Sequence, residues 1–326
     1  MTSNGSSESG CSVFERDGAE STKHSGLAAE GMGAPKAEDV FPCWCGSGKW
    51  QPRVRGRRFH VLQCSSCRGY RIDPPPLHSA RDSAPFYTDY YRTVCTDAQA
   101  IKMPVGSRSA AFWKVAERFD ALCRVEQRAV DIGCGDGHLC AELHAHGWPF
   151  VAGIDVSQTR IERAKRLYPH LTFFDRPLAE TGLGKSSLDL IVMDAVIEHL
   201  PLPLETLREF LEFLVPGGRI VLTTPNMDSG EFRLLRKRWT SMLAPHAHIF
   251  LFSPASIQRL VSEAGFISEC TGNYHSPLYT PIEYLKRIGR GDVKGALWRA
   301  HQELGSIYGR LIDAGHMLFA VARKPH

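Results

Sequence analysis

Three glycines and a set of carboxylates between residues 128 and 155 are the residues whose types and spacing most clearly indicate chemistry. Gly133, Gly135 and Gly137 follow a short apolar run that ends at Ile132, and Asp155 lies eighteen residues beyond the last glycine. Glycines at a turn from a strand into a helix let a ligand approach the backbone, and the helix start offers free N–H groups. A carboxylate about 20 residues after such a turn accepts hydrogen bonds from ribose hydroxyls. The stretch therefore predicts a nucleoside-binding turn.

The charges beside these glycines restrict the kind of nucleoside. The spacing Gly-x-Gly-x-Gly is one residue shorter than the dinucleotide fingerprint, and Asp131 and Asp136 lie just before it and inside it. Carboxylates there repel a pyrophosphate but suit a ligand that carries an ammonium and a sulfonium. With this pattern, roughly residues 128 to 324 resemble the class I S-adenosylmethionine-dependent methyltransferases. An ordinary glycine-rich turn of some other α/β protein is the alternative interpretation.

The resemblance implies S-adenosyl-L-methionine as the cofactor and a set of residues that bind it. Asp175 follows the third expected strand and would contact the adenine amine, although it is equally well interpreted as a surface-loop carboxylate. Asp194 ends the fourth strand, on the side of an open sheet where ligands bind. The full predicted set is Asp131, Gly133, Gly135, Gly137, Asp155, Asp175 and Asp194.

Three histidines are candidates for a catalytic base. An oxygen acceptor must lose its proton, and histidine titrates in the suitable range. His199 lies in the Val-Ile-Glu-His-Leu run at 196–200, which resembles the post-strand motif of small-molecule O-methyltransferases. His246 and His248 precede a Phe-Ser-Pro segment that also resembles the family. We expect His199 and His248 to be catalytic; the alternative is that Glu198 and His199 only cap and orient the next helix.

These features predict a methyltransferase that acts on a small-molecule acceptor, at an oxygen or at a sugar carbon, by in-line transfer with a histidine base. The motif of enzymes that methylate exocyclic base amines is missing, because Asp194 is followed by Ala-Val-Ile. One alternative function is a zinc-ribbon protein that binds or modifies RNA. Another is a cofactor-binding scaffold without turnover. The sequence identifies neither the acceptor nor the oligomeric state.

Four cysteines form two close pairs near the N-terminus, and they predict a structural zinc site. The segment resembles the N-terminal zinc ribbon of many small-molecule methyltransferases, although the first pair there is usually Cys-x-x-Cys and here is Cys-x-Cys. A degenerate ribbon without metal is the alternative. Five basic residues between positions 49 and 58 could bind nucleic acid, but a solvated hairpin is favoured because they show no evident aromatic stacking platform. The predicted ligands are Cys43, Cys45, Cys64 and Cys67.

The composition is that of an ordinary globular chain of 326 residues. Its net charge of +4 does not by itself indicate a nucleic-acid partner. No apolar run reaches the roughly 18 residues that span a bilayer, and the N-terminus lacks an apolar signal core. The six cysteines outside the two pairs are scattered, as in a reducing compartment. We therefore expect a cytoplasmic protein without a transmembrane segment.

Alternating apolar strands and amphipathic helices must position these residues. The pattern predicts an α/β fold with a Rossmann-like, doubly wound sheet, and the resemblance implies seven strands with the last one antiparallel. Strands are expected at 129–132, 150–154, 171–174, 188–194, 220–224, 266–271 and 316–323. Helices are expected at 109–122, from about 138, at 157–167 and 203–214, and from Pro254, where Ser253 would be the N-cap.

Composition shifts divide the chain into four segments. Residues 1–38 lack large apolar side chains and predict a disordered tail, and residues 39–76 predict the zinc-ribbon module. A helical lid or linker is expected at 77–127, including an aromatic patch at 85–91, before a methyltransferase domain at 128–326. Insertions near 227–252 and 276–313 would shape the acceptor pocket. The basic stretch 231–239 in the first insertion could cover an acidic or lipid-like acceptor or rest on an anionic membrane surface, but packing as an ordinary surface helix is favoured.

Overall fold

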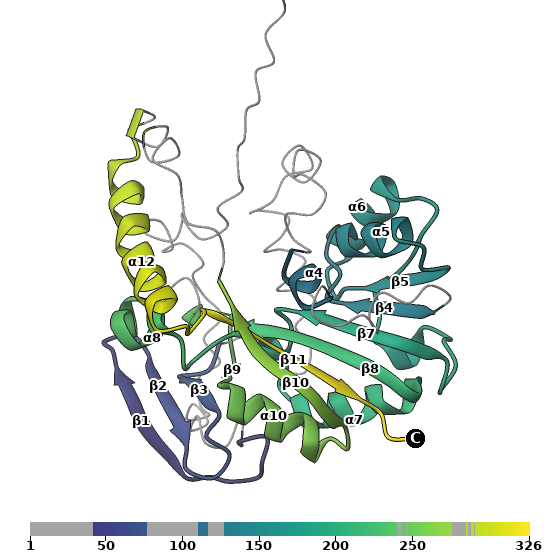
Figure 1. The fold of residues 1–326 in the computed structure, drawn as a ribbon, viewed down its shortest axis with the longest axis horizontal. Coiled ribbons are helices and arrows are strands. Elements are labelled where there is room, and N and C mark those ends of the chain that lie inside the picture. Colours follow the sequence, from purple (N-terminus) through teal and green to yellow (C-terminus); the bar gives the residue numbers. More distant parts are fainter. Residues whose placement is uncertain are drawn as a thin grey trace, which may run out of the picture.

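The computed structural model describes residues 42–76, 110–116, 127–239, 243–245, 247–275, 285, 288–289 and 291–326. These residues form two β-sheets with helices around them (Figure 1). The expectations for the tail 1–38, the aromatic patch 85–91 and His246 lie outside the described residues, as does most of the predicted lid.

The larger sheet has seven strands in the order β10-β11-β8-β7-β4-β5-β6. All are parallel except β11, which pairs antiparallel with both of its neighbours. The predicted seven-stranded, doubly wound sheet with an antiparallel last strand is therefore confirmed. Its strands are β4 (Arg128–Ile132), β5 (Phe150–Ile154), β6 (Thr172–Phe174), β7 (Leu188–Asp194), β8 (Leu214–Pro225), β10 (Ile267–Tyr274) and β11 (Met317–Arg323).

Both faces of this sheet are buried, because successive strand residues point to opposite sides. Leu190 and Val192 of β7 pack into the core formed with α4 (Ala110–Ala116), α5 (His138–Ala145) and α6 (Gln158–Leu167). Ile191 and Met193 pack on the other face with α7 (Pro203–Phe213) and α10 (Pro254–Glu263). Figure 1 shows the two helical layers on opposite sides of the sheet. This arrangement explains the almost wholly apolar run of β7.

Local sequence signals set several element ends correctly. The Ser253 side chain accepts a hydrogen bond from the backbone N–H of Ser256 and caps α10, and Pro254 is its first residue. The Pro-Gly-Gly-Arg run at residues 216–219 predicts a tight turn before the fifth strand. The run lies within β8, but the pairing with β7 is interrupted there, since the partner of Leu188 is Leu214 and that of Leu190 is Arg219. Gly217 has a left-handed φ of 76°, and the backbones of Gly217 and Gly218 form hydrogen bonds with Lys324 instead.

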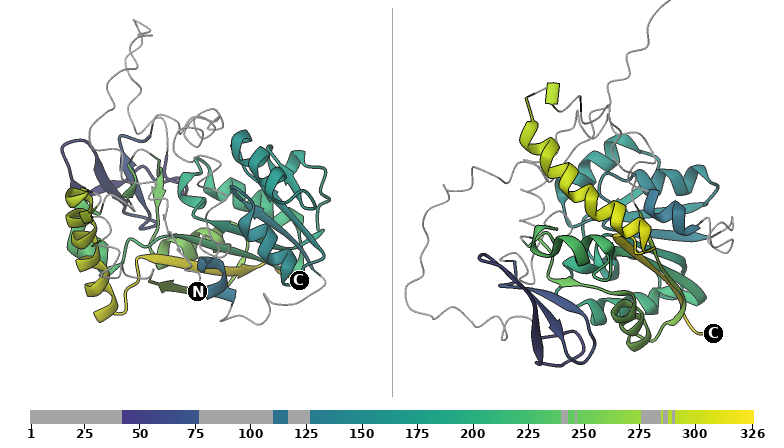
Figure 2. Two further views of the ribbon diagram at one scale, coloured as in Figure 1. Left: turned by 90° about the horizontal axis from the view of Figure 1, so that it is seen from above. Right: turned by 60° about the vertical axis from the view of Figure 1, so that its left-hand side comes forward.

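The smaller sheet contains the N-terminal cysteine segment. It consists of β1 (Trp50–Arg55), β2 (His60–Cys64), β3 (Tyr70–Asp73) and β9 (Phe250–Leu251). The two-residue strand β9 comes from the first insertion and pairs antiparallel with β3, Tyr70 opposite Leu251. Figure 2 shows this sheet lying beside the larger one. The insertion therefore links the cysteine segment to the rest of the molecule.

The two insertions supply helices that lie against each other. The first contributes α8 (Gly230–Leu235) and the 3-10 turn η5 (Arg236–Arg238), and the second contributes α12 (Val293–Leu311). Their backbones touch, because a β-carbon on Gly230 would lie 2.3 Å from the Cα of Gly309. The helix expected across 231–239 ends early, since Arg236 adopts a left-handed φ of 50°. The basic residues Arg236, Lys237 and Arg238 therefore form a separate 3-10 turn and do not continue α8.

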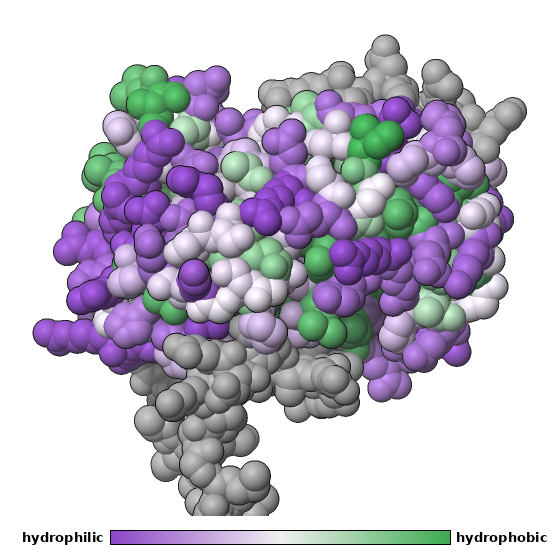
Figure 3. Space-filling view, turned by 90° about the horizontal axis from the view of Figure 1, so that it is seen from below, coloured by the Kyte–Doolittle hydropathy of each residue, from purple (hydrophilic) through white to green (hydrophobic). Residues whose placement is uncertain are grey.

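No helix in the described parts of the chain is both long and apolar enough to cross a membrane. Figure 3 shows one face of the molecule, on which hydrophilic residues dominate and apolar residues gather only in small groups. Such scattered apolar groups are usual on the surface of a globular protein.

Candidate functional site

The three glycines form a tight turn between β4 and α5. All three have left-handed backbones, with φ of 75° at Gly133, 57° at Gly135 and 80° at Gly137. A β-carbon would lie 2.3 Å from Val196 at the first, 1.9 Å from the Arg160 guanidinium at the second and 2.7 Å from Phe173 at the third. Side chains are therefore excluded both by backbone strain and by space.

Asp155 holds this turn against the end of β5. One carboxylate oxygen accepts a hydrogen bond from the backbone N–H of Gly135 and the other from that of Ser157, each at 2.8 Å. The side chain has no ion pair among the described residues and is 7% exposed. Each carboxylate oxygen has further lone pairs, so these bonds leave acceptor capacity for ligand hydroxyls. The predicted carboxylate thus lies beside the glycine turn and also stabilises it.

Asp136 does not have the role that its position suggested. Its carboxylate is 1% exposed and forms ion pairs with Arg160 at 3.4 Å and Arg163 at 3.2 Å, both on α6. Its negative charge is therefore compensated inside the protein instead of being presented to a ligand. The acidic character of the site comes from the remaining carboxylates.

Asp131 and Asp194 end neighbouring strands. Burial raises the pKa of Asp131 well above its usual range, and the charges of Asp194 and Asp155 raise it further. Burial also raises the pKa of Asp194 to about 6, although a hydrogen bond from the Thr223 hydroxyl opposes this. Nearby negative groups of this kind favour a cationic ligand. Asp175 lies exposed at the end of β6, which agrees with its interpretation as a surface carboxylate.

His199 and His248 meet beyond the end of β7. Their rings lie edge to face with centroids 4.7 Å apart. The Nδ1 atom of His199 is 3.0 Å from the carbonyl oxygen of Ala247, which only accepts hydrogen bonds. His199 Nδ1 therefore carries the hydrogen, and the basic lone pair is on Nε2.

Glu198 completes this cluster, although the sequence indicates only the histidines as candidate catalytic residues. It is 1% exposed, accepts a hydrogen bond from the Thr224 hydroxyl at 3.0 Å, and lies 3.9 Å from His248 Nε2. Burial raises its pKa to about 8. One carboxylate and two imidazoles with ligand atoms within 4.8 Å of one another could hold a metal ion. The polar Thr223-Thr224 pair near the end of the otherwise apolar strand β8 is the sequence signal that could have indicated polar partners at this edge of the sheet.

The four N-terminal cysteines converge on one point. Cys43 Sγ lies 3.4 Å from Cys67 Sγ and 3.5 Å from Cys45 Sγ, and Cys45 Sγ lies 3.7 Å from Cys64 Sγ. Thiolates bound to one tetrahedral zinc ion at about 2.3 Å lie about 3.8 Å apart, so the cluster fits such an ion. Backbone N–H groups of Ser66 and Gly69 point at Cys64 and Cys67, and the contact with Cys43 lowers the pKa of Cys67 to about 6.

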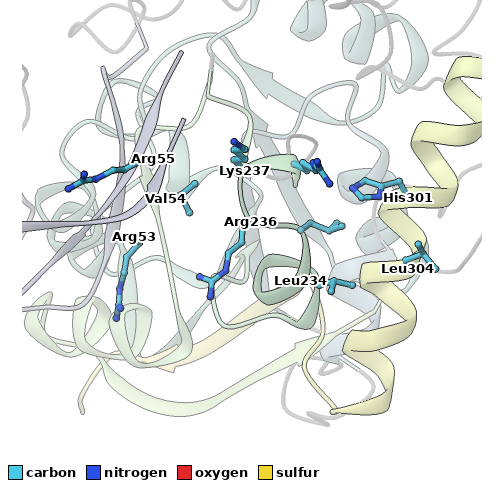
Figure 4. Close-up of a pocket in the computed structure, with 10 residues that line it drawn as sticks. Arg53, Val54, Arg55, Leu234, Arg236, Lys237, His301 and Leu304 are labelled. Atoms are coloured by element: carbon cyan, nitrogen blue, oxygen red, sulfur yellow. The ribbon is translucent and has the colours of Figure 1, made fainter. Parts of the chain in front are cut away.

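A separate, basic hollow of about 610 Å³ lies between β1 of the smaller sheet, the α8–η5 segment and α12 (Figure 4). The two basic runs of the sequence meet there, since Arg53 and Arg55 come from β1 and Arg236 and Lys237 from η5. His301 and Leu304 of α12 form the opposite wall. Sequence reasoning treated these two runs separately because about 180 residues lie between them.

Comparisons with known proteins identify the family. Residues 108–269 match the family model described as "Methyltransferase domain". The chain is 25% identical over 255 residues to the biotin biosynthesis bifunctional protein BioHC of Cellvibrio japonicus, which covers 72% of this chain and 49% of that protein. It is 25% identical over 190 residues to the ubiquinone biosynthesis O-methyltransferase of Vibrio parahaemolyticus, covering 54% of this chain and 77% of that protein. The chain thus spans about half the length of the first of these relatives.

A solved structure shares the fold. The phosphoethanolamine N-methyltransferase 2 of Haemonchus contortus, in complex with S-adenosyl-L-methionine, is 19% identical and superposes with a TM-score of 0.51 over 74% of this chain and 60% of that one. The strand order and the glycine turn agree with the family match. The chain therefore belongs to the class I S-adenosylmethionine-dependent methyltransferase family.

Proposed function

We propose that this protein transfers the methyl group of S-adenosyl-L-methionine to an oxygen of a small molecule. The observation that carries this proposal is the glycine turn closed by Asp155, beside Asp194 and the His199–His248 pair on the same edge of the sheet. The likeness to a ubiquinone biosynthesis O-methyltransferase supports an oxygen acceptor. A sugar carbon is the alternative acceptor.

The cofactor site would use different residues for the different parts of the ligand. Asp155 would accept hydrogen bonds from the ribose hydroxyls, and the turn at Gly133, Gly135 and Gly137 would let the ligand lie against the backbone. Asp131 and Asp194 would balance the positive charges of the amino acid part and the sulfonium. Asp175 would contact the adenine amine. Because the Asp175 side chain is exposed, this is the least supported of the proposed residue roles.

The reaction would be an in-line displacement in which the protein mainly orients the reactants. The bond between methyl carbon and sulfur breaks as the bond to the acceptor oxygen forms. The hydroxyl proton would pass to Nε2 of His199, whose tautomer is set by the Ala247 carbonyl. His248 is the second candidate base, and Glu198 beside it would hold its ring in position.

Calorimetric titration and product analysis test this function. We expect S-adenosyl-L-methionine and S-adenosyl-L-homocysteine to bind, and methyl label to appear in phenols or carboxylic acids of a metabolite panel. A chain that binds the cofactor but labels only RNA would shift the assignment to the alternative function. Absence of heat with both cofactor forms would remove the methyltransferase proposal altogether.

The cysteine cluster would hold a structural zinc ion through Cys43, Cys45, Cys64 and Cys67. The spacing of their sulfur atoms and the N–H groups directed at two of them support this. Zinc would stabilise a three-stranded unit that has little apolar core of its own. Metal analysis of the purified protein tests the proposal, and less than about 0.2 zinc per chain would contradict it.

The basic hollow favours RNA binding as a second candidate function. Five arginine and lysine residues from β1 and η5 line one concave surface, whereas the sequence alone suggested only the ribbon charges. Phosphates bound there would make affinity fall steeply with salt. We expect Arg236→Ala with Lys237→Ala to reduce this salt-dependent binding. RNA binding that is absent at 50 mM salt would eliminate the candidate.

A further inference from the structure

We propose that Glu231, His275 and His316 form a binding site for a divalent transition metal, with zinc as the ion that this donor set suits best. The site is distinct from the cysteine cluster and from the Glu198, His199 and His248 cluster. Two imidazoles and one carboxylate are an established ligand set for zinc. The proposal does not depend on the methyl-transfer function.

The geometry fits one shared ion. One ligand atom of each residue lies within 4.8 Å of the others, and Nδ1 of His316 is 3.4 Å from Oε1 of Glu231. Two ligands bound at about 2.0–2.1 Å to a tetrahedral ion lie about 3.3–3.4 Å apart, so this pair already has the separation of co-ligands. The imidazole of His275 faces that of His316, with ring centroids 6.5 Å apart.

The three residues come from three elements that the backbone holds in place. Glu231 is in the first turn of α8, His275 follows β10, and His316 precedes β11. The backbone of His316 accepts a hydrogen bond from the N–H of Asn226 at 2.8 Å, and Gly230 donates to Ala314 at 3.0 Å. A metal ion here would connect the first insertion directly to the end of the sheet.

The carboxylate of Glu231 is the observation that calls for a cation. It is 2% exposed, and neither oxygen accepts a hydrogen bond from any residue that the structure describes. The backbone of α12 covers it, since a β-carbon on Gly309 would lie 2.9 Å from Oε2 of Glu231. Buried carboxylates normally accept several hydrogen bonds. A metal ion would use these lone pairs.

A plain ion pair between Glu231 and a protonated His316 is the competing explanation. An ion pair with His316 would engage Oε1 of Glu231, 3.4 Å from His316 Nδ1, and would leave the buried Oε2 without a hydrogen bond among the described residues. A metal ion bound by the carboxylate and both imidazoles could use this oxygen, so the metal site explains the geometry better.

Metal content of the full-length protein provides the first test. Each variant is loaded with Zn²⁺, dialysed, and measured for zinc per chain. Glu231→Gln and His316→Gln should each contain one zinc fewer than the wild type. The matched control is Glu303→Gln, which removes another buried carboxylate of the same region that is paired with Arg299 instead. Equal zinc content in all four proteins would overturn the proposal.

Unfolding measurements distinguish the metal site from the ion pair. With a metal site, added Zn²⁺ should raise the unfolding temperature of the wild type and of Glu303→Gln more than that of Glu231→Gln. In chelator, Glu231→Gln should be at least as stable as the wild type, because an unsatisfied carboxylate has been removed. If Glu231 and His316 form an ion pair instead, Glu231→Gln should be less stable than the wild type in chelator. Added Zn²⁺ should then raise the unfolding temperatures of the wild type and this variant equally. If neither Glu231→Gln nor His316→Gln folds, zinc content and unfolding temperature are measured for His275→Gln, whose side chain is only half-buried.

Discussion

The imidazole of His199 meets that of His248 edge to face, with ring centroids 4.7 Å apart, although His199 follows β7 and His248 lies near the end of the first insertion. The main chain reinforces this contact, because the N–H of Ile249 donates to the carbonyl of Glu198 at 2.9 Å and His199 Nδ1 donates to that of Ala247. The loop after β7 and the segment before α10 therefore form one unit. Both segments therefore hold in place the imidazoles that could accept a proton at this edge of the sheet.

Replacing His199 by Asn should lower kcat by about 10²- to 10⁴-fold, the usual contribution of a general base. The Asn side-chain amide can still donate to the Ala247 carbonyl, so the loop should keep its conformation while the base is lost. Cofactor affinity should be unchanged in calorimetry. His170→Asn, an exposed histidine after α6, is the control. Full activity of His199→Asn would leave His248 as the remaining candidate.

Gly135→Ala should weaken binding of S-adenosyl-L-homocysteine at least about tenfold, or about 1.4 kcal/mol. The new methyl group would lie 1.9 Å from the Arg160 guanidinium and would strain a left-handed backbone. The N–H that Asp155 holds would shift with it. Gly48→Ala is the matched control, because nothing lies within 4 Å of its added carbon. Unaltered calorimetric affinity of Gly135→Ala would exclude the turn from the cofactor site.

Cofactor affinity should rise as the pH rises through about 6. Burial raises the pKa of Asp194 to about 6, so its carboxylate is mostly protonated at pH 5 and mostly ionised at pH 7. Only the ionised form attracts an ammonium or a sulfonium. The same raised pKa favours the folded state at low pH, and this contribution is lost as the pH rises through the folded pKa. Titrations at pH 5, 6 and 7 check this, and Asp194→Asn should remove the pH dependence.

Removing the zinc ion that we propose for the cysteine cluster should loosen the smaller sheet while the larger one stays folded. Cys67→Ser leaves three thiolates and exposes β1 to β3 to unfolding, because this sheet has only a small core of its own. Hydrogen exchange should then accelerate in β3 and in β9, its pairing partner, but not in β4 or β7. Cys270→Ser, outside the cluster, is the control. Unaltered exchange in β3 would show that the ribbon is stable without metal.

The larger sheet was predictable because its signals are local. The apolar run 188–194 coincides with β7, and Ser253 and Pro254 mark the start of α10. The partners of these elements were harder to predict. The two-residue strand β9 carries no periodic signal and is defined only by its pairing with β3, about 180 residues away. Its formation depends on tertiary contacts, which override local propensity.

Charged side chains were predictable in type but not in direction. Asp136 lies in the glycine turn, yet its carboxylate pairs with two arginines of α6. Sequence spacing gave no sign of this, because Arg160 and Arg163 lie in the helix expected at 157–167, where charged side chains usually face solvent. Glu231, His275 and His316 are likewise distant in sequence and converge only through the two insertions. Contacts between insertions depend on packing that a period or motif does not encode.

The basic hollow predicts that the two charged runs act as one surface. Arg53→Ala with Arg55→Ala on β1, and Arg236→Ala with Lys237→Ala on η5, should each lower RNA affinity and reduce the slope of log K against log salt. For single strands this slope is about −0.7 for each phosphate neutralised, so two lost contacts should reduce it by about 1.4. Arg57→Ala with Arg58→Ala removes the same charge from the ribbon but outside the hollow, and it should have a smaller effect. Equal losses in all three double variants would mean that RNA responds only to net charge, in which case the convergence of β1 and η5 has no role in recognition.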